Sequence, residues 1–163
     1  FLYYFYNKIY ILFTHKIIHH ILFYNKGIKN MQINEKINQI AEDFSYFSCW
    51  EEKYEYIIDL GKKLPPMDEA LKTEETKVKG CMSQVWLVAL EQKDNRLKII
   101  ADSDAIIVKG LIALVLKIFD GASREEIKQV NISELFKKLE LDSNIAGTRR
   151  NGLASMIEKI KTF

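Results

Sequence analysis

The sequence predicts an α+β domain in which a small three-stranded antiparallel sheet packs against several helices. Apolar residues recur at helical spacing before residue 65 and again after residue 104, whereas residues 76–101 alternate and are rich in β-prone side chains. The strands are therefore grouped between two sets of helices, and such grouping is typical of α+β folds rather than of alternating α/β folds. A length of 163 residues suits one domain.

Residues 33–64 predict two helices. The apolar side chains of the first helix fall on one face: Ile33, Ile37, Ile40, Phe44 and Phe47. The run Ser48-Cys49-Trp50-Glu51 has the pattern of a capping box and would start the second helix. Pro65 and Pro66 prevent that helix from continuing. We interpret Cys49 as a packing residue beside the second helix start.

The centre of the chain predicts three strands, over residues 76–80, 84–91 and 96–101. A polar turn at residues 92–95 joins the last two strands into a hairpin. Cys81 is expected in the loop between the first and second strands.

The remainder of the chain predicts further helices. Residues 105–119 are apolar on nearly all sides and indicate a buried helix, with Asp104 or Ser103 as its N-cap. Ser123 begins a second capping-box pattern, which predicts a short helix. Another short helix follows, and Thr148 is expected to cap the last one.

Residues 1–30 differ in composition from the rest. They hold four of the chain's 24 basic side chains and none of its 22 acidic ones, so residues 31–163 carry a net charge of −2. Polar and basic residues interrupt the apolar run too often for a membrane span, and no secretory signal is legible. We interpret residues 1–30 as translated upstream sequence, disordered in or absent from the natural protein, with the domain at 31–163. The alternative is an amphipathic arm that lies on a membrane surface.

This division limits the chemistry that the domain can perform. All three histidines lie in residues 1–30, which leaves Cys49 and Cys81 as the cysteines and no histidine from Met31 onward. Ser-His-Asp and Cys-His catalysis and Cys/His metal sites are therefore not expected. A mildly acidic domain has no electrostatic reason to bind nucleic acid. We expect a protein of the reducing cytoplasm without a disulfide framework or a membrane association.

Cys81 is the candidate nucleophile. Gly80 before it permits backbone conformations closed to other residues, which suits a loop that presents a side chain. Lys79 is near enough to favour a thiolate. Arg149, at the start of the last helix, could reach the same region once the chain folds. The alternative is a buried packing cysteine, because free cysteine is among the most buried residue types.

Four blocks of sequence, in order, resemble the SufE family of sulfur acceptor proteins. One contains the pattern G-C-x-S-x-V-W, in Gly80-Cys81-Met82-Ser83-Gln84-Val85-Trp86. The other three are residues 50–61, residues 102–113 and residues 148–153. Together the blocks extend over essentially all of residues 31–163.

The resemblance implies a fold like that of IscU-type scaffolds and a role in iron–sulfur cluster assembly. It implies that Cys81 accepts persulfide sulfur from a SufS-type cysteine desulfurase and delivers it to the SufBCD scaffold, and that the protein stimulates the desulfurase. Pyridoxal phosphate would belong to the desulfurase, and this chain would need no cofactor or metal. It would be a sulfurtransferase-like carrier without independent turnover. Gly80, Asp104 and Arg149 lie in these blocks, and together with Lys79, which is chosen for its nearness to Cys81, they would support the partner contact or the persulfide.

Two other functions stay open on the sequence. The chain would act as a non-catalytic module that docks and activates a desulfurase if Cys81 is structural. It would act as a thiol redox sensor if an exposed Cys81 forms sulfenic acid. The oligomeric state, including a homodimer, is also open.

Overall fold

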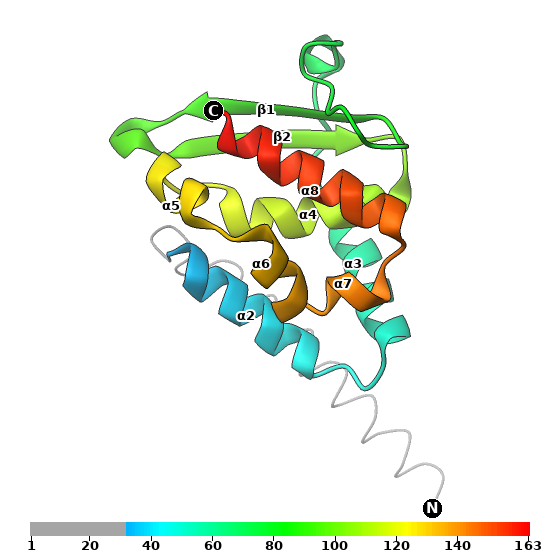
Figure 1. The fold of residues 1–163 in the computed structure, drawn as a ribbon. Coiled ribbons are helices and arrows are strands. Elements are labelled where there is room, and N and C mark those ends of the chain that lie inside the picture. The colour runs from blue at the N-terminus through cyan, green and yellow to red at the C-terminus, as the bar shows by residue number, and fades with distance from the viewer. Residues whose placement is uncertain (1–31) are drawn as a thin grey trace, which may run out of the picture. The chain divides into compact units, whose positions relative to one another are not determined.

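A computed structural model describes residues 32–163, so the interpretation of residues 1–30 lies outside the described residues. The elements follow one another as α2 (Ile33–Ser45), α3 (Trp50–Lys62), η2 (Glu69–Leu71), β1 (Val85–Glu91), η3 (Lys93–Asn95), β2 (Leu97–Ser103), α4 (Ile106–Phe119), α5 (Arg124–Gln129), α6 (Ile132–Lys138), α7 (Leu141–Asn144) and α8 (Gly147–Lys161). The predicted α+β class is confirmed (Figure 1). Among these helices none is long and apolar enough to cross a membrane.

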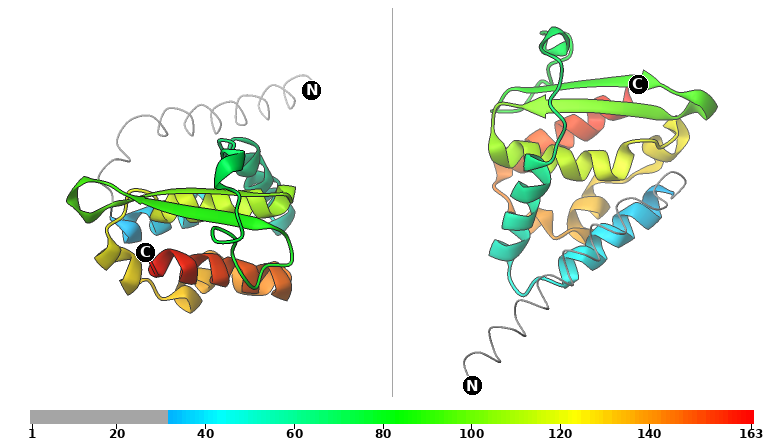
Figure 2. Two further views of the ribbon diagram at one scale, coloured as in Figure 1. Left: turned by 90° about the horizontal axis from the view of Figure 1, so that it is seen from above. Right: turned by 180° about the vertical axis from the view of Figure 1, so that it is seen from behind.

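The sheet is an antiparallel pair of strands covered by helices on one face (Figures 1 and 2). In its register Val85 stands opposite Ser103 and Glu91 opposite Leu97. Alternate side chains of the two strands are buried, as a sheet with one covered face requires: Val85, Leu87, Leu97, Ile99 and Ala101. Helices α4 and α8 run beneath this face (Figure 1).

The prediction of a third strand is not confirmed. Within residues 76–80 only Lys77 forms a bridge to the sheet, opposite Trp86. Gly80 then has a φ of +86°, which turns the chain out of the extended conformation. The carbonyls of Glu75, Thr76 and Lys77 accept hydrogen bonds from the side chain of Lys159, and of these three the Thr76 carbonyl also accepts from β1, from the Leu87 N–H. Strand pairing therefore stops after a single bridge.

Helices α3 and α4 cross at two glycines. A Cβ on Gly61 would lie 2.5 Å from the backbone nitrogen of Gly110, so the two backbones are in direct contact. Ile57, one turn before Gly61, has no exposed surface. This crossing fixes α4, and with it the end of β2 that precedes α4.

The helix starts agree only in part with the predicted caps. Ser123 and Glu126 form the predicted capping box, with each side chain accepting from the other's backbone N–H. The predicted cap of α4 is wrong, because the N-cap residue is Ala105. Ser103 Oγ accepts from the Ala105 N–H at 3.3 Å, while the side chain of Asp104 turns toward the start of β1.

Two further caps fall one or two residues from the predicted positions. The N-cap of α3 is Cys49 rather than Ser48, and it is Glu52 that accepts from the Ser48 N–H, at 2.7 Å. The N-cap of α8 is Ala146, so Thr148 lies inside the helix. The predicted helices exist, but local polar residues did not mark their first residues.

Candidate functional site

Cys81 lies on a short loop, residues 79–84, between the Lys77 bridge and β1. The side chain of Cys81 is half-buried against the hydrophobic core. Its neighbour Met82 is 85% exposed. The loop therefore alternates between a side chain that faces the protein and one that faces solvent.

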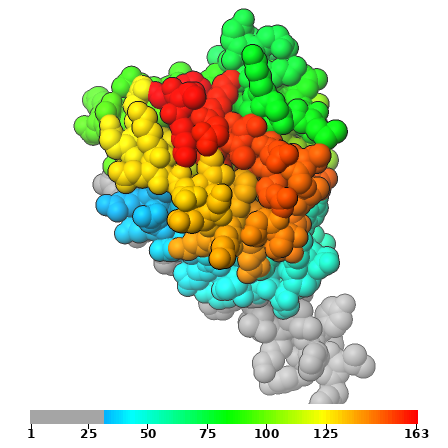
Figure 3. All heavy atoms as spheres, viewed as in Figure 1, coloured from blue at the N-terminus to red at the C-terminus, as the bar shows by residue number. Residues whose placement is uncertain are grey.

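Helix α8 forms the surface against which this loop rests. The Cys81 thiol donates a weak hydrogen bond to the carbonyl oxygen of Gly152 at 3.5 Å. A Cβ on Gly152 would lie 3.2 Å from Cys81 Sγ, so the absence of a side chain there makes room for the sulfur. One turn further along α8, a Cβ on Gly80 would lie 2.9 Å from Ser155 Oγ. In Figure 3 the green atoms of this segment lie directly against the orange and red atoms of α8.

Burial against α8 raises the pKa of the Cys81 thiol. Desolvation disfavours the thiolate, and no cation within the described residues counters that effect. In this position the thiol is therefore protonated near neutral pH. We call the position of the Cys81 sulfur against Gly152 of α8 its seat. To act as a nucleophile, Cys81 must leave this seat and reach solvent or a partner.

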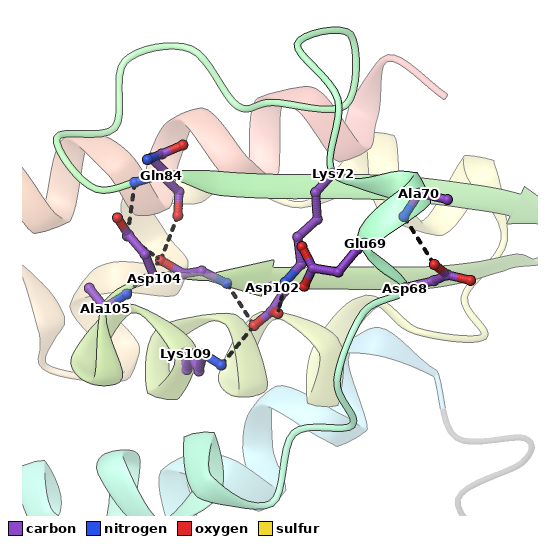
Figure 4. A network of polar contacts seen from close by, with 10 residues as sticks. Asp68, Glu69, Ala70, Lys72, Gln84, Asp102, Asp104, Ala105 and Lys109 are labelled. Atoms are coloured by element: carbon purple, nitrogen blue, oxygen red, sulfur yellow. Dashed lines mark hydrogen bonds and ion pairs between the residues drawn. The ribbon is translucent and has the colours of Figure 1, made fainter.

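Asp104 fastens the other end of the loop (Figure 4). Its Oδ1 accepts from the Gln84 N–H at 3.0 Å, and its own N–H donates to the Gln84 carbonyl at 3.3 Å. Ser103 Oγ donates to the same carbonyl at 2.7 Å. These bonds join the first residues of β1 to the junction of β2 and α4, and they define where the loop ends.

A buried carboxylate, Asp102, gathers two lysines beside this junction (Figure 4). Asp102 is 4% exposed and forms ion pairs with Lys72 at 3.0 Å and Lys109 at 3.1 Å. Burial alone would raise the pKa of this carboxyl, but the two lysines and the Ser103 N–H lower it below its usual value. Lys72 also lies over the ring of Trp86, 5.5 Å from its centroid. The network ties the segment before the Cys81 loop to the sheet and to α4.

The sequence analysis did not identify this network. Lys72 comes from a segment that reads only as a polar surface loop, 30 residues before its partner. An acidic residue at the end of an otherwise apolar strand was the available signal. The network forms one wall of a surface hollow of about 630 Å³, whose lining includes Lys62 and Ile106. No group of three or more histidine, cysteine or acidic residues within 32–163 is arranged to hold a metal ion.

The other candidate residues lie around the loop without touching the thiol. Lys79 is exposed, and Arg149 lies over the ring of Tyr54 with its guanidinium carbon 6.0 Å from the ring centroid. In the described part of the chain, no hydrogen bond or ion pair joins either residue to Cys81. Cys49 is exposed at the start of α3, so its interpretation as a packing residue is wrong.

Most of the described domain is similar to proteins of one family. Residues 38–163 match the family model described as "SufE: Fe-S metabolism associated domain". An uncharacterized SufE-like protein of Rhizobium meliloti is 44% identical over 129 residues, which cover 77% of this chain and 92% of that protein. A SufE-like protein of Rhizobium etli is 43% identical over 128 residues, covering 77% and 86%.

A solved structure supports the fold independently. The solution structure of a hypothetical protein from Thermus thermophilus superposes with a TM-score of 0.65 at 19% identity, covering 78% of this chain and 91% of that one. That likeness concerns the fold alone. The family match and the two relatives extend over nearly the whole described domain, and on that ground this chain belongs to the SufE family.

Proposed function

We propose that this protein is a sulfur carrier of the cytoplasm that accepts sulfane sulfur on Cys81 from a SufS-type cysteine desulfurase. It stimulates that enzyme and delivers the sulfur to the SufBCD scaffold for iron–sulfur cluster assembly. Membership of the SufE family supports the general role. The observation that carries the assignment to Cys81 is its setting, a half-buried thiol held by one weak hydrogen bond on a loop whose next side chain is exposed.

The transfer itself is a thiol–persulfide exchange. The Cys81 thiolate attacks the terminal sulfur of the donor's cysteine persulfide, and a new S–S bond forms on Cys81 Sγ. The bond between the donor's two sulfur atoms breaks, and its electron pair leaves with the donor cysteine as a thiolate. No outside oxidant or reductant is needed. The pyridoxal phosphate stays on the desulfurase, and this chain contributes no cofactor of its own.

The seat on Gly152 gives this carrier a resting state. While Cys81 is seated its thiol is protonated, because burial raises its pKa, and it is shielded from stray oxidants. When the loop swings out, Lys79 lies two residues from the sulfur and favours the thiolate. We propose that Arg149, one turn before Gly152 on α8, binds either the anionic persulfide or an acidic surface of the partner. Asp104 holds the loop's far end at Gln84.

A mass measurement tests the assignment. The protein is incubated with a SufS-type desulfurase, pyridoxal phosphate and free cysteine, and its intact mass and peptides are measured. We expect the mass of one added sulfur atom on the Cys81 peptide, removed by reductant. A Cys49→Ser variant is the matched control and should gain the same mass. Normal sulfur delivery by a Cys81→Ser variant would contradict the proposal. A wild-type protein that stimulates the desulfurase fully but gains no sulfur on Cys81 would act by docking alone.

A further inference from the structure

Lys159, on α8, binds the backbone that leads into the Cys81 loop. Its Nζ donates to three consecutive carbonyl oxygens, those of Glu75 at 3.1 Å, Thr76 at 2.7 Å and Lys77 at 3.0 Å. An ammonium group has three hydrogens, so all of its donors are used. One side chain thereby holds a whole turn of main chain more than 80 residues away in the sequence.

These carbonyls are the ammonium's main partners. The ion pairs formed within residues 32–163 do not include Lys159. Partial burial lowers the pKa of Lys159, and no carboxylate of the described chain offsets that effect. A charged group that is partly desolvated depends on its carbonyl partners, so the three hydrogen bonds favour one fixed position of the segment.

The contact lies in line with the seat of the thiol. Gly152, Ser155 and Lys159 are spaced by three and four residues, which places them along one face of α8. Gly152 receives Cys81 Sγ, Ser155 lies under Gly80, and Lys159 holds the carbonyls before them. A single helix face therefore contacts the loop from its base to its sulfur.

We propose that Lys159 is a positioning residue that clamps the base of the Cys81 loop to α8 and so keeps the thiol on its seat. With residues 75–77 clamped and Gln84 bonded to Asp104, movement of the sulfur is confined to residues 79–83. The proposal rests on the proposed function for its biological meaning, because a carrier must expose its sulfur to a partner and shield it otherwise.

Replacing Lys159 with methionine keeps an apolar stem of similar length and removes the ammonium. Thr76 keeps a second donor, since its carbonyl also accepts from the Leu87 N–H at 2.8 Å. The carbonyls of Glu75 and Lys77 lose the bond that fixes them. The base of the loop then opens more often, and Cys81 spends more time off its seat.

The test is the rate at which iodoacetamide alkylates Cys81 in the folded protein. It is performed in a Cys49→Ser background, so that one thiol reacts, and it needs no desulfurase. We expect Lys159→Met to raise the rate about fivefold, because several hydrogen bonds to a charged group are lost at once. Lys161→Met is the matched control, since Lys161 on the same helix donates to one distant carbonyl, that of Val130, at 2.8 Å. Its rate should stay at the wild-type value.

Two further measurements separate positioning from general weakening. Lys159→Arg keeps a cation with several donors and should return the rate most of the way to wild type. Amide hydrogen exchange in Lys159→Met should speed up at Val78 and Leu87, whose N–H groups donate to Val85 and Thr76 and so join residues 76–78 to β1. The buried amides of β2 should keep their protection. A wild-type alkylation rate in Lys159→Met, or an equal rise in Lys161→Met, would overturn the proposal. Because the probe is a small alkylating agent, failure of sulfur delivery at Cys81 would leave this result unaffected.

Discussion

The crossing of α3 and α4 and the contact of Cys81 with α8 each depend on a missing side chain, and they differ in what fills the space. At the crossing of α3 and α4, the backbone of Gly110 occupies the place where a Gly61 side chain would lie. At the seat on α8, the sulfur of Cys81 occupies the place beside Gly152. Backbone packed on backbone has no other favourable position, whereas a thiol and a carbonyl can each exchange their partner for water.

The difference separates stability from motion within one small domain. The crossing lies in the core beside Ile57, which has no exposed surface, and it fixes the helices under the sheet. The Cys81 loop is held by polar contacts at its two ends and by one weak bond at its sulfur. Such contacts open at low cost compared with global unfolding. A sulfur carrier would need both properties, a fixed packing of its helices and a thiol that can change its position.

The largest expected effect comes from a methyl group at the crossing. Gly61→Ala would place a Cβ within 3.0 Å of three backbone atoms of α4, so the helices must move apart. We expect a loss of about 3 kcal/mol in the free energy of unfolding, the upper range for overpacking a core. Urea titration followed by circular dichroism measures it.

Gly121→Ala is the control for this first prediction. Gly121 has a φ of +74° but open space around the position of a Cβ, so the substitution costs only the left-handed backbone, about 1 kcal/mol. If the two variants lose equal stability, the crossing of α3 and α4 is less tightly packed than we describe. It would then not be the rigid part of the domain.

A buried polar contact gives an intermediate effect. Asp102→Asn keeps the shape of the side chain but removes the charge shared by Lys72 and Lys109. We expect a loss of about 2 kcal/mol, less than for a fully buried pair because Lys109 is partly exposed. Glu69→Gln, which alters a partner of Lys72 that is 84% exposed, should change stability by less than about 0.5 kcal/mol.

The pH dependence of this effect follows from the lowered pKa of Asp102. A carboxyl whose pKa is depressed by folding contributes its full stability above its unfolded pKa of about 3.9, and it loses that contribution as the pH falls through the folded pKa. The stability gap between wild type and Asp102→Asn should therefore be constant between about pH 5 and about pH 7 and narrow below about pH 4. A gap independent of pH down to about pH 2 would exclude the ion pairs as its cause.

A smaller effect on stability, with a larger one on reactivity, is expected at the seat of the thiol. Gly152→Ala would bring a methyl group 3.2 Å from Cys81 Sγ, and the loop rather than the helix should give way. We expect the free energy of unfolding to change by about 1 kcal/mol or less and Cys81 alkylation to become several-fold faster. Gly147→Ala, on the same helix with only an ordinary contact to Arg150, should change neither. A large loss of stability without faster alkylation would mean that the loop cannot leave α8.

What the sequence could predict was set by how local the cause is. The apolar stripe of α2 and the Ser123 capping box depend on residues within four positions of each other. The capping box was right, and the stripe was right from Ile33 to Phe44, whereas Phe47 lies beyond the helix, which ends at Ser45. The third strand was not confirmed, because Gly80 with a φ of +86° turns the chain after a single bridge, and the carbonyls of Thr76 and Lys77 bind Lys159, more than 80 residues away. No periodicity or propensity reports a contact of that kind.

The candidate site shows the same limit. Cys81 and Gly80 were identifiable because the G-C pattern is contiguous. The sequence predicted Asp104 as a possible cap of α4 and not as the partner of Gln84, because an acidic residue between a strand and a helix suits either role. Gly152 and Lys159 lie on a helix that reads as an ordinary amphipathic segment, and only the folded chain brings them to the thiol and its loop.

The smallest effect expected is a shift in a titration. In a Cys49→Ser background, the rate of Cys81 alkylation follows the thiolate fraction, and burial raises the pKa of that thiol. Its midpoint should therefore lie above the value of about 8.5 expected for the same cysteine in the urea-unfolded chain. Because folding favours the neutral thiol, the stability that Cys81 contributes is full below the unfolded pKa and is lost as the pH rises through the folded one. In Gly152→Ala the midpoint should return toward the unfolded value. An unshifted midpoint in the wild type would show that the thiol already spends most of its time off the seat. The crossing of α3 and α4 would then be compared with a loop that is open at rest, not with one that opens and closes.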